Sequence, residues 1–221
     1  MMNKHPSSFG NNVSRRAFLT TSAAAATLGP LAAAGRSAHA AGSDRIRVGV
    51  VGCGNRGTGA AMNCVLSTPG VEIVALGDLF QDRVDSAFQS FTQDENLKGK
   101  VDITRDRCFT GFDNYKGVCA CPDVNLIVTA APPGFRPLHL AAAVEAGKHV
   151  FMEKPVAVDP PGGRKIIAAG EMAKQKGLAV VAGTQRRHQA GYQRIKYALE
   201  RGAIGEIAGG AVWWCGGALW Y

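Results

Sequence analysis

Beyond Asp44, short apolar runs alternate with stretches of helical periodicity, and this alternation is the strongest constraint on the fold. The stretches between the runs predict helices, and strands that alternate with such helices form a parallel sheet covered on both faces. Near-continuous apolar runs are typical of strands that are buried on both faces. An α/β, doubly wound fold is therefore expected. The predicted strands are 45–51, 71–78, 124–132, 149–153, 178–184 and a short one within 95–108, and the predicted helices are 57–68, 81–91, 113–120, 135–147 and 159–177.

Capping residues mark the ends of two of these helices. Asp159 precedes a proline at the first helical position, which predicts an N-cap. Gly147 and Gly177 stand where the helices 135–147 and 159–177 end, as C-terminal glycines commonly do.

A glycine-rich turn follows the first predicted strand. The residues Gly52-Cys53-Gly54-Asn55-Arg56-Gly57 form a G-x-G-x-x-G pattern that opens a helix. In a Rossmann-type fold the first glycine permits the tight turn, the second lets the backbone approach a pyrophosphate, and the third lets helix and strand pack closely. The helix N-terminus then offers free N–H groups to the phosphates. Gly52, Gly54, Asn55, Arg56 and Gly57 are therefore candidate cofactor-binding residues.

An acidic residue ends the second predicted strand. Asp78 lies 21 positions after Gly57, close to the spacing at which dinucleotide sites place an acid for the adenosine ribose hydroxyls. Such an acid repels a 2′-phosphate, so NAD is preferred and NADP is the alternative. Arg83 lies nearby and could weaken that preference. The competing interpretation is a plain glycine turn with an exposed aspartate.

The tripeptide Glu153-Lys154-Pro155 interrupts an apolar run at the end of the strand 149–153. Ligands of open α/β sheets bind at the carboxyl ends of the strands, and the proline ends central pairing there. The Lys154 ammonium would then face the same crevice as the cofactor. The alternative is that Glu153 and Lys154 are solvated turn residues.

These motifs together resemble one family. "GCGNRG", "GD" at 77–78, "AAPPGFRPLHLAAAVEAGKHVFMEKP" and "GTQRRH", in this order, resemble the glucose–fructose oxidoreductase / inositol dehydrogenase (Gfo/Idh/MocA) family from residue 45 to about 221. The resemblance implies a nicotinamide dinucleotide cofactor and a sugar or polyol substrate. It also implies that Lys154 contacts the nicotinamide end and assists proton transfer, and that the 154–155 peptide bond is cis.

The resemblance implies roles for other residues of the crevice. The backbone at Ala131 and Pro132 would pass the nicotinamide riboside, and Glu153 would position backbone or ribose. Gln185 and Arg187 would touch cofactor or substrate, with a surface basic run as the equal alternative. Two histidines are weaker candidates: His139, inside a predicted helix, is expected to pack or cap, and His188 is a lone histidine.

The resemblance implies a second domain, of which the sequence holds only the beginning. A Rossmann domain at 44–185 is expected, followed by the start of an incomplete α+β domain at 186–221, with a helix at 188–205 and a strand at 206–214. The chain is expected to be truncated there, to bind dinucleotide and to turn over little. Homo-oligomers are expected of the full-length protein.

The first forty residues have a different character from the rest. They carry four basic residues and no acid, with Arg15-Arg16 before an uncharged stretch and the small residues Ala38 and Ala40 at its end. This pattern predicts a twin-arginine signal peptide at 1–40 and a periplasmic protein. A membrane anchor at 17–35 is the alternative, but the stretch is only weakly apolar.

The net charge and the cysteine spacing of the chain limit the classes of function that it could have. The net charge is +8, and about half of it resides in the first forty residues, so the remaining balance does not indicate nucleic-acid binding. The six cysteines lack zinc-site spacing and are expected to be small buried hydrophobes. The leading hypothesis is an NAD(P)-dependent oxidoreductase of sugar-like polyols. An NAD-dependent glycoside hydrolase on the same fold and a non-catalytic dinucleotide-binding module stay open.

Overall fold

The computed structural model describes residues 44–213 and 215–216. A six-stranded sheet, parallel throughout, has the strand order β3-β2-β1-β4-β5-β6. This is the strand order of a Rossmann fold, and the predicted fold class is confirmed. The strands are β1 (Ile46–Val51), β2 (Val71–Asp78), β3 (Cys108–Thr110), β4 (Leu126–Thr129), β5 (His149–Met152) and β6 (Val180–Ala182).

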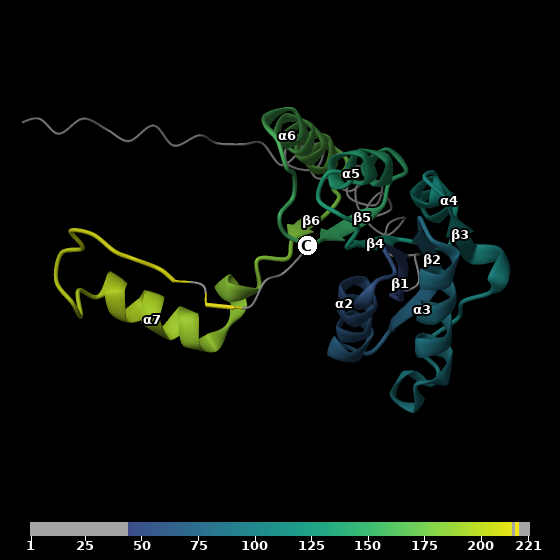
Figure 1. Ribbon diagram of the computed structural model, residues 1–221, viewed down its shortest axis with the longest axis horizontal. Coiled ribbons are helices and arrows are strands. Elements are labelled where there is room, and N and C mark those ends of the chain that lie inside the picture. Colours follow the sequence, from purple (N-terminus) through teal and green to yellow (C-terminus); the bar gives the residue numbers. More distant parts are fainter. Residues whose placement is uncertain (1–43, 214, 217–221) are drawn as a thin grey trace, which may run out of the picture. The chain divides into compact units, whose positions relative to one another are not determined.

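Helices cover both faces of this sheet (Figure 1). Two helices pack on one face, α2 (Asn55–Ser67) and α3 (Gln81–Gln93). Three pack on the other face, α4 (Asn114–Ala120), α5 (Arg136–Glu145) and α6 (Pro160–Gln175). Asp159 caps α6 by accepting a hydrogen bond from the Gly162 N–H, as predicted. The remaining helices are the 3₁₀-helices η1 (Glu95–Leu97), η2 (Arg105–Arg107) and η3 (Gln185–His188), and α7 (Ala190–Glu200).

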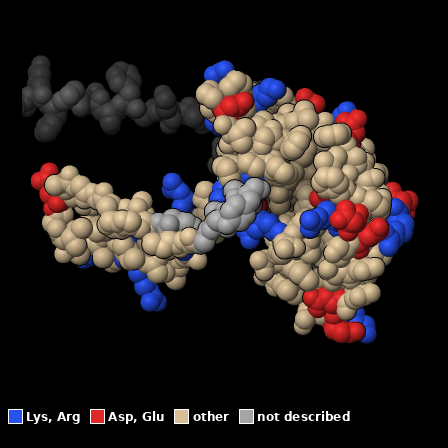
Figure 2. Space-filling model, in the orientation of Figure 1, with Lys and Arg blue, Asp and Glu red and all other residues tan. Residues whose placement is uncertain are grey.

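Each face of the sheet has its own hydrophobic core. Successive side chains of a strand point to opposite faces, so Val48 and Val50 pack with Val65 of α2, whereas Val51 packs with Val118 of α4. Burial on both faces explains why the central strands are apolar almost without interruption. Acidic and basic side chains are mixed on the face of the molecule that Figure 2 shows.

Two glycines set the geometry at the end of β1. Gly52 has a positive φ of 93°, and a Cβ there would stand 2.5 Å from the backbone nitrogen of Ala131. A Cβ at Gly57 would stand far inside the contact distance of the Gly52 carbonyl oxygen. Both positions therefore require glycine, and α2 begins directly against the carboxyl end of β1.

The strand predicted at 206–214 is wrong for the described residues 206–213, which form no strand. β-propensity is local, whereas a strand needs a hydrogen-bonding partner, and no strand of the described chain pairs with this segment. The helix predicted at 188–205 is the shorter α7, preceded by η3. None of the residues of α7 is buried, and Trp213 is 79% exposed.

Several predictions concern residues outside the described ones. The signal peptide predicted at 1–40 lies there, as does position 214, the last residue of the strand predicted at 206–214. Among the residues that the structure describes, no helix is both long and apolar enough to cross a membrane. All six cysteines are free thiols, of which three are buried, two are half-buried and Cys215 is exposed, which partly matches the expectation of small buried hydrophobes.

The close approach at Gly57 predicts a large difference between two alanine substitutions within α2. Gly57→Ala is expected to lower the free energy of unfolding by about 3 kcal/mol, because backbone must move to admit the methyl group. Gly59→Ala, where a Cβ meets nothing within 4 Å, is expected to raise it by about 0.5–1 kcal/mol through helix propensity. Urea unfolding of the two variants checks this, and equal effects would contradict the described packing.

Candidate functional site

A cleft of about 260 Å³ opens at the carboxyl edge of the sheet. Residues from the ends of β1, β2 and β4 and from the first turns of α2, α4 and α5 line it. This is the edge, and the switch point between β1 and β4, at which open α/β sheets bind ligands. Of the residues predicted to bind cofactor, the cleft includes Gly52, Gly54, Arg56, Gly57, Asp78, Ala131 and Pro132.

The glycine-rich turn presents the amino end of α2 to this cleft. Gly54 is the N-cap residue, has no side chain to occupy the helix end, and stands in open space, with nothing within 4 Å of a built Cβ. The first turn of α2 contains no acidic residue. Its first N–H groups lack intrahelical acceptors and carry the positive end of the helix dipole, so this turn suits a phosphate.

Asp78 ties the end of β2 to the glycine-rich turn. The Cys53 N–H donates to Asp78 Oδ2 at 2.6 Å, and the Phe80 N–H donates to Oδ1 at 3.0 Å. These two bonds fix the orientation of the carboxylate at the cleft. An ionised carboxylate has about four acceptor positions, so Asp78 keeps capacity for further donors.

Three residues near Asp78 that were not predicted, Phe80, Phe112 and Asn114, complete this part of the cleft. The rings of Phe80 and Phe112 line it and are largely exposed, and Arg83, which the sequence placed near Asp78, lines it as well. Asn114 is buried and lines the same cleft, and its Oδ1 has no hydrogen-bond partner. Phe112 and Asn114 follow β3, which overlaps the range 95–108 predicted for a short strand only at Cys108. The predicted range was polar and irregular, so no local signal placed Phe112 and Asn114 beside Asp78.

His139 is a buried, neutral histidine of the cleft. Its ring stacks on Tyr115 with centroids 4.6 Å apart, in keeping with the predicted packing role, but its Nδ1 has no hydrogen-bond partner. Burial, with a smaller contribution from the Arg136 charge, lowers the pKa of His139 to about 4. His139 is therefore uncharged at neutral pH, and this residue of the cleft lining contains a buried polar atom without a partner.

Glu153 is buried, and its alternative interpretation as a solvated turn residue is wrong. Its side chain is 2% exposed and forms an ion pair with Arg56 of the glycine-rich turn. Gly183 leaves room for this carboxylate, because a Cβ there would stand 3.0 Å from Glu153 Oε1. Glu153 thus connects the end of β5 with the beginning of α2.

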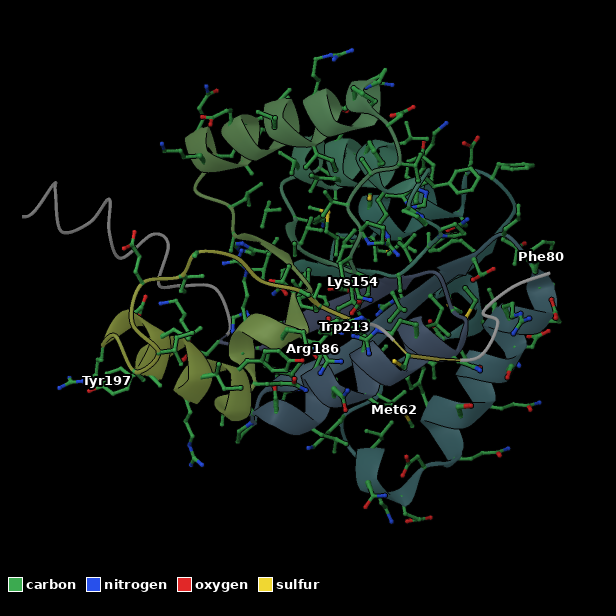
Figure 3. The ribbon with its side chains drawn as sticks, turned by 60° about the vertical axis from the view of Figure 1, so that its left-hand side comes forward. Met62, Phe80, Lys154, Arg186, Tyr197 and Trp213 are labelled. Carbon is green, nitrogen blue, oxygen red and sulfur yellow. The ribbon has the colours of Figure 1, made fainter. Side chains whose placement is uncertain are left out.

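Lys154 lies at the same edge of the sheet as the glycine-rich turn, because its neighbour Glu153 pairs with Arg56. The Lys154 side chain is exposed, and the Lys154–Pro155 peptide bond is cis, as the resemblance implied. Figure 3 shows Lys154 well separated from Phe80, so the two mark different parts of this edge. The site therefore extends across the sheet.

A buried arginine that the sequence reasoning missed holds the segment around Lys154. Arg136, at the beginning of α5, donates to the carbonyl oxygens of Ala131, Glu153 and Pro155. Burial lowers the pKa of this guanidinium. In the sequence, Arg136 stands between the predicted strands 124–132 and 149–153. This position alone does not reveal which carbonyl groups accept its hydrogen bonds.

Five predicted residues do not line the cleft. Glu153 and Lys154 lie beyond its lining at the end of β5, Asn55 is exposed at the first position of α2, and Gln185 and Arg187 are exposed on η3. In the described part of the chain, no three His, Cys, Asp or Glu side chains come together in a way that could hold a metal ion.

The fold and the cleft define a Rossmann domain with a nucleotide-type site. The chain matches, over residues 46–184, the family described as "Oxidoreductase family, NAD-binding Rossmann fold". It therefore belongs to the Gfo/Idh/MocA family of oxidoreductases.

Curated relatives carry the names of inositol dehydrogenases. The chain is 36% identical over 162 residues to an inositol 2-dehydrogenase/D-chiro-inositol 3-dehydrogenase of Halalkalibacterium halodurans, covering 73% of this chain and 42% of the relative. It is 34% identical over 161 residues to the protein of the same name from Shouchella clausii, with the same two coverages. The chain thus spans about two fifths of the length of these relatives.

Solved structures share the fold. Scyllo-inositol dehydrogenase from Lactobacillus casei, solved with bound NAD(H) and scyllo-inositol, superimposes with a TM-score of 0.59 at 24% identity, over 74% of this chain and 43% of that one. A 3-ketoreductase from Actinomadura kijaniata, solved with TDP-benzene and NADP, gives a TM-score of 0.57 at 24% identity, over 74% and 45%.

The depressed pKa of His139 predicts a pH dependence of stability. Between pH 6.5 and about 4 the unfolded chain takes up a proton on this imidazole and the folded protein does not, so the free energy of unfolding falls as the pH is lowered. The loss is of the order of 3 kcal/mol. Urea unfolding across this range is expected to show a shallower slope for His139→Phe, whereas His188→Phe, at an exposed histidine, keeps the wild-type slope. An unchanged slope in His139→Phe would contradict the assignment.

Proposed function

We propose that the protein containing this chain is an NAD(P)-dependent oxidoreductase that transfers a hydride to or from a carbinol of a cyclitol or sugar-like polyol. Membership of the oxidoreductase family and the inositol dehydrogenase names of the relatives support this. The observation that carries the proposal is the ion pair of Glu153 with Arg56, because it joins the segment of Lys154 to the glycine-rich turn in one site.

The cleft fits a nicotinamide dinucleotide in three respects. The amino end of α2 is open at Gly54 and suits the pyrophosphate. The fixed carboxylate of Asp78 suits ribose hydroxyls. The unpartnered Asn114 Oδ1 and His139 Nδ1 are buried polar atoms that a ligand with polar edges would satisfy. When bound, the dinucleotide supplies the acceptor or donor of the hydride.

Lys154 is the residue that we assign to proton transfer. Its Nζ is exposed at the carboxyl end of β5, and among the described residues it has no hydrogen-bond or ion-pair partner. An amine in this position takes the proton of a hydroxyl that is being oxidised, or returns it in the reverse direction. The exposed Nζ is free to reach a substrate at the same edge.

Asp78 favours NAD over NADP. Its carboxylate accepts hydrogen bonds from a ribose and repels a 2′-phosphate at the same place. Arg83 lines the same cleft and is the cation that would partly offset this repulsion. We therefore expect a preference for NAD with measurable use of NADP.

For the whole protein we further propose export through the twin-arginine pathway to the periplasm, and assembly as a homo-oligomer. The paired Arg15-Arg16 and the uncharged stretch that follows support the export signal at residues 1–40. Fusing these residues to a reporter enzyme tests the signal. Export that persists after Arg15 and Arg16 are both replaced by lysine would contradict it.

The proposed reaction predicts net formation of reduced nicotinamide when the whole protein meets NAD and an inositol. Lys154→Met is expected to lower kcat by about 10²–10⁴, with little change in the Kd of NAD, because only proton transfer is lost. Lys174→Met, at an exposed lysine of α6, is the control and keeps wild-type kcat. If the protein instead releases an aglycone from glycosides and forms no net reduced nicotinamide, the proposal is wrong. The protein would then be a glycoside hydrolase.

The role of Asp78 predicts a change in cofactor choice. Asp78→Asn is expected to weaken NAD binding about 10- to 100-fold, because hydrogen bonds to a charged group are lost, and to shift the preference towards NADP. Asp82→Asn removes a nearby exposed acid outside the cleft lining and is expected to change neither affinity. Calorimetric titration of both cofactors checks this, and equal losses in the two variants would refute direct contact.

A further inference from the structure

We infer that Arg136 is a positioning residue that fixes Lys154 relative to the cleft. The inference rests on the proposed function, because it assigns a partner to the residue proposed for proton transfer. Lys154 is held through the main chain, at the carbonyl groups of its two neighbours Glu153 and Pro155.

The hydrogen bonds of Arg136 surround Lys154 in the chain. Arg136 Nη1 donates to the Glu153 carbonyl oxygen at 2.7 Å and also to the carbonyl oxygen of Pro155. These two carbonyls belong to the residues on either side of Lys154. A single nitrogen therefore restrains the peptide group that precedes Lys154 and the peptide group that follows Pro155.

The other edge of the same guanidinium reaches the end of β4. Arg136 Nε donates to the Ala131 carbonyl oxygen at 2.8 Å, and Ala131 lines the cleft. The planar guanidinium thus sets the spacing between the cleft wall and the segment of Lys154. Lysine carries a single donor atom on a flexible stem and does not reproduce this fork.

The burial of Arg136 makes the arrangement stiff. The residue is 5% exposed, and Glu153, whose charge acts on the guanidinium, is itself paired with Arg56 of the glycine-rich turn. Removing the guanidinium leaves three carbonyl oxygens without their donor, at sites where water has limited access. The segment around Lys154 is then free to shift while the glycine-rich turn keeps its own contacts.

Another buried cation of the chain provides a matched control. Lys148 donates to the carbonyl oxygens of Cys121 at 2.9 Å and Val124 at 2.6 Å. It precedes β5, whereas Lys154 follows the opposite end of that strand. Lys148→Ala removes a comparable set of bonds without touching the segment of Lys154.

The test uses the whole protein with Arg136→Ala, Arg136→Lys and Lys148→Ala. Arg136→Ala is expected to lower kcat about 100-fold, as misplacement of a reacting group by roughly 1 Å does, with the Kd of NAD little changed. Guanidinium ion added to the buffer is expected to restore part of kcat. Lys148→Ala is expected to lose stability, to keep kcat and to show no response to guanidinium.

A second readout does not depend on turnover. Labelling of Lys154 by trinitrobenzenesulfonate, located by peptide mass spectrometry, is expected to change in rate in Arg136→Ala and to return towards the wild-type rate with guanidinium. If the wild-type protein oxidises no polyol, the proposed function fails, and the labelling rates still decide the role of Arg136.

Two results would overturn the inference. One is an unchanged labelling rate of Lys154 in Arg136→Ala or, should that variant not fold, in Arg136→Lys. The other is full wild-type kcat in Arg136→Lys, because a positive charge alone would then suffice beside Glu153. Reduced kcat and altered labelling in Arg136→Lys would support the inference that the two donor atoms of the guanidinium, Nε and Nη1, position Lys154.

Discussion

The contact between the Gly52 carbonyl and the beginning of α2 is the constraint on which the rest of the site depends. Only a glycine at position 57 allows this approach, and it places the helix N-terminus at the carboxyl end of β1. From there the Cys53 N–H reaches Asp78, and Arg56 reaches Glu153. The close approach of α2 to Gly52 thus brings together the ends of β1, β2 and β5.

The two sides of the site differ in which groups are held in place and which are left without partners. At the side of Asp78, fixed backbone donors orient the carboxylate, while Asn114 and His139 contain buried polar atoms without partners. At the side of Lys154, buried arginine and glutamate groups hold the backbone, and the lysine amine itself stays exposed. Unsatisfied buried groups are costly in a folded protein, so their gathering in one cleft favours a ligand that pairs with them.

The sequence predicted what depends on local pattern and missed what depends on strand neighbours. The strands, the glycine-rich turn and Asp78 follow from periodicity and spacing, and the strand order agrees with them. Arg136 was missed because two of its acceptors lie 17 and 19 residues further along the chain and become its neighbours only when β4 and β5 pair. The strand predicted at 206–214 was wrong for the described residues 206–213 for the converse reason, since local propensity supplies no partner strand.

The central claim is that the carboxyl edge between β1 and β4 binds a nicotinamide dinucleotide whose reactive end lies towards Lys154. A crystal structure of the whole protein soaked with NAD tests it most directly. The account predicts a pyrophosphate against the N–H groups that open α2, a ribose on Asp78 and the nicotinamide on the side of Lys154. A dinucleotide bound elsewhere, or a reactive end directed away from that amine, would contradict it.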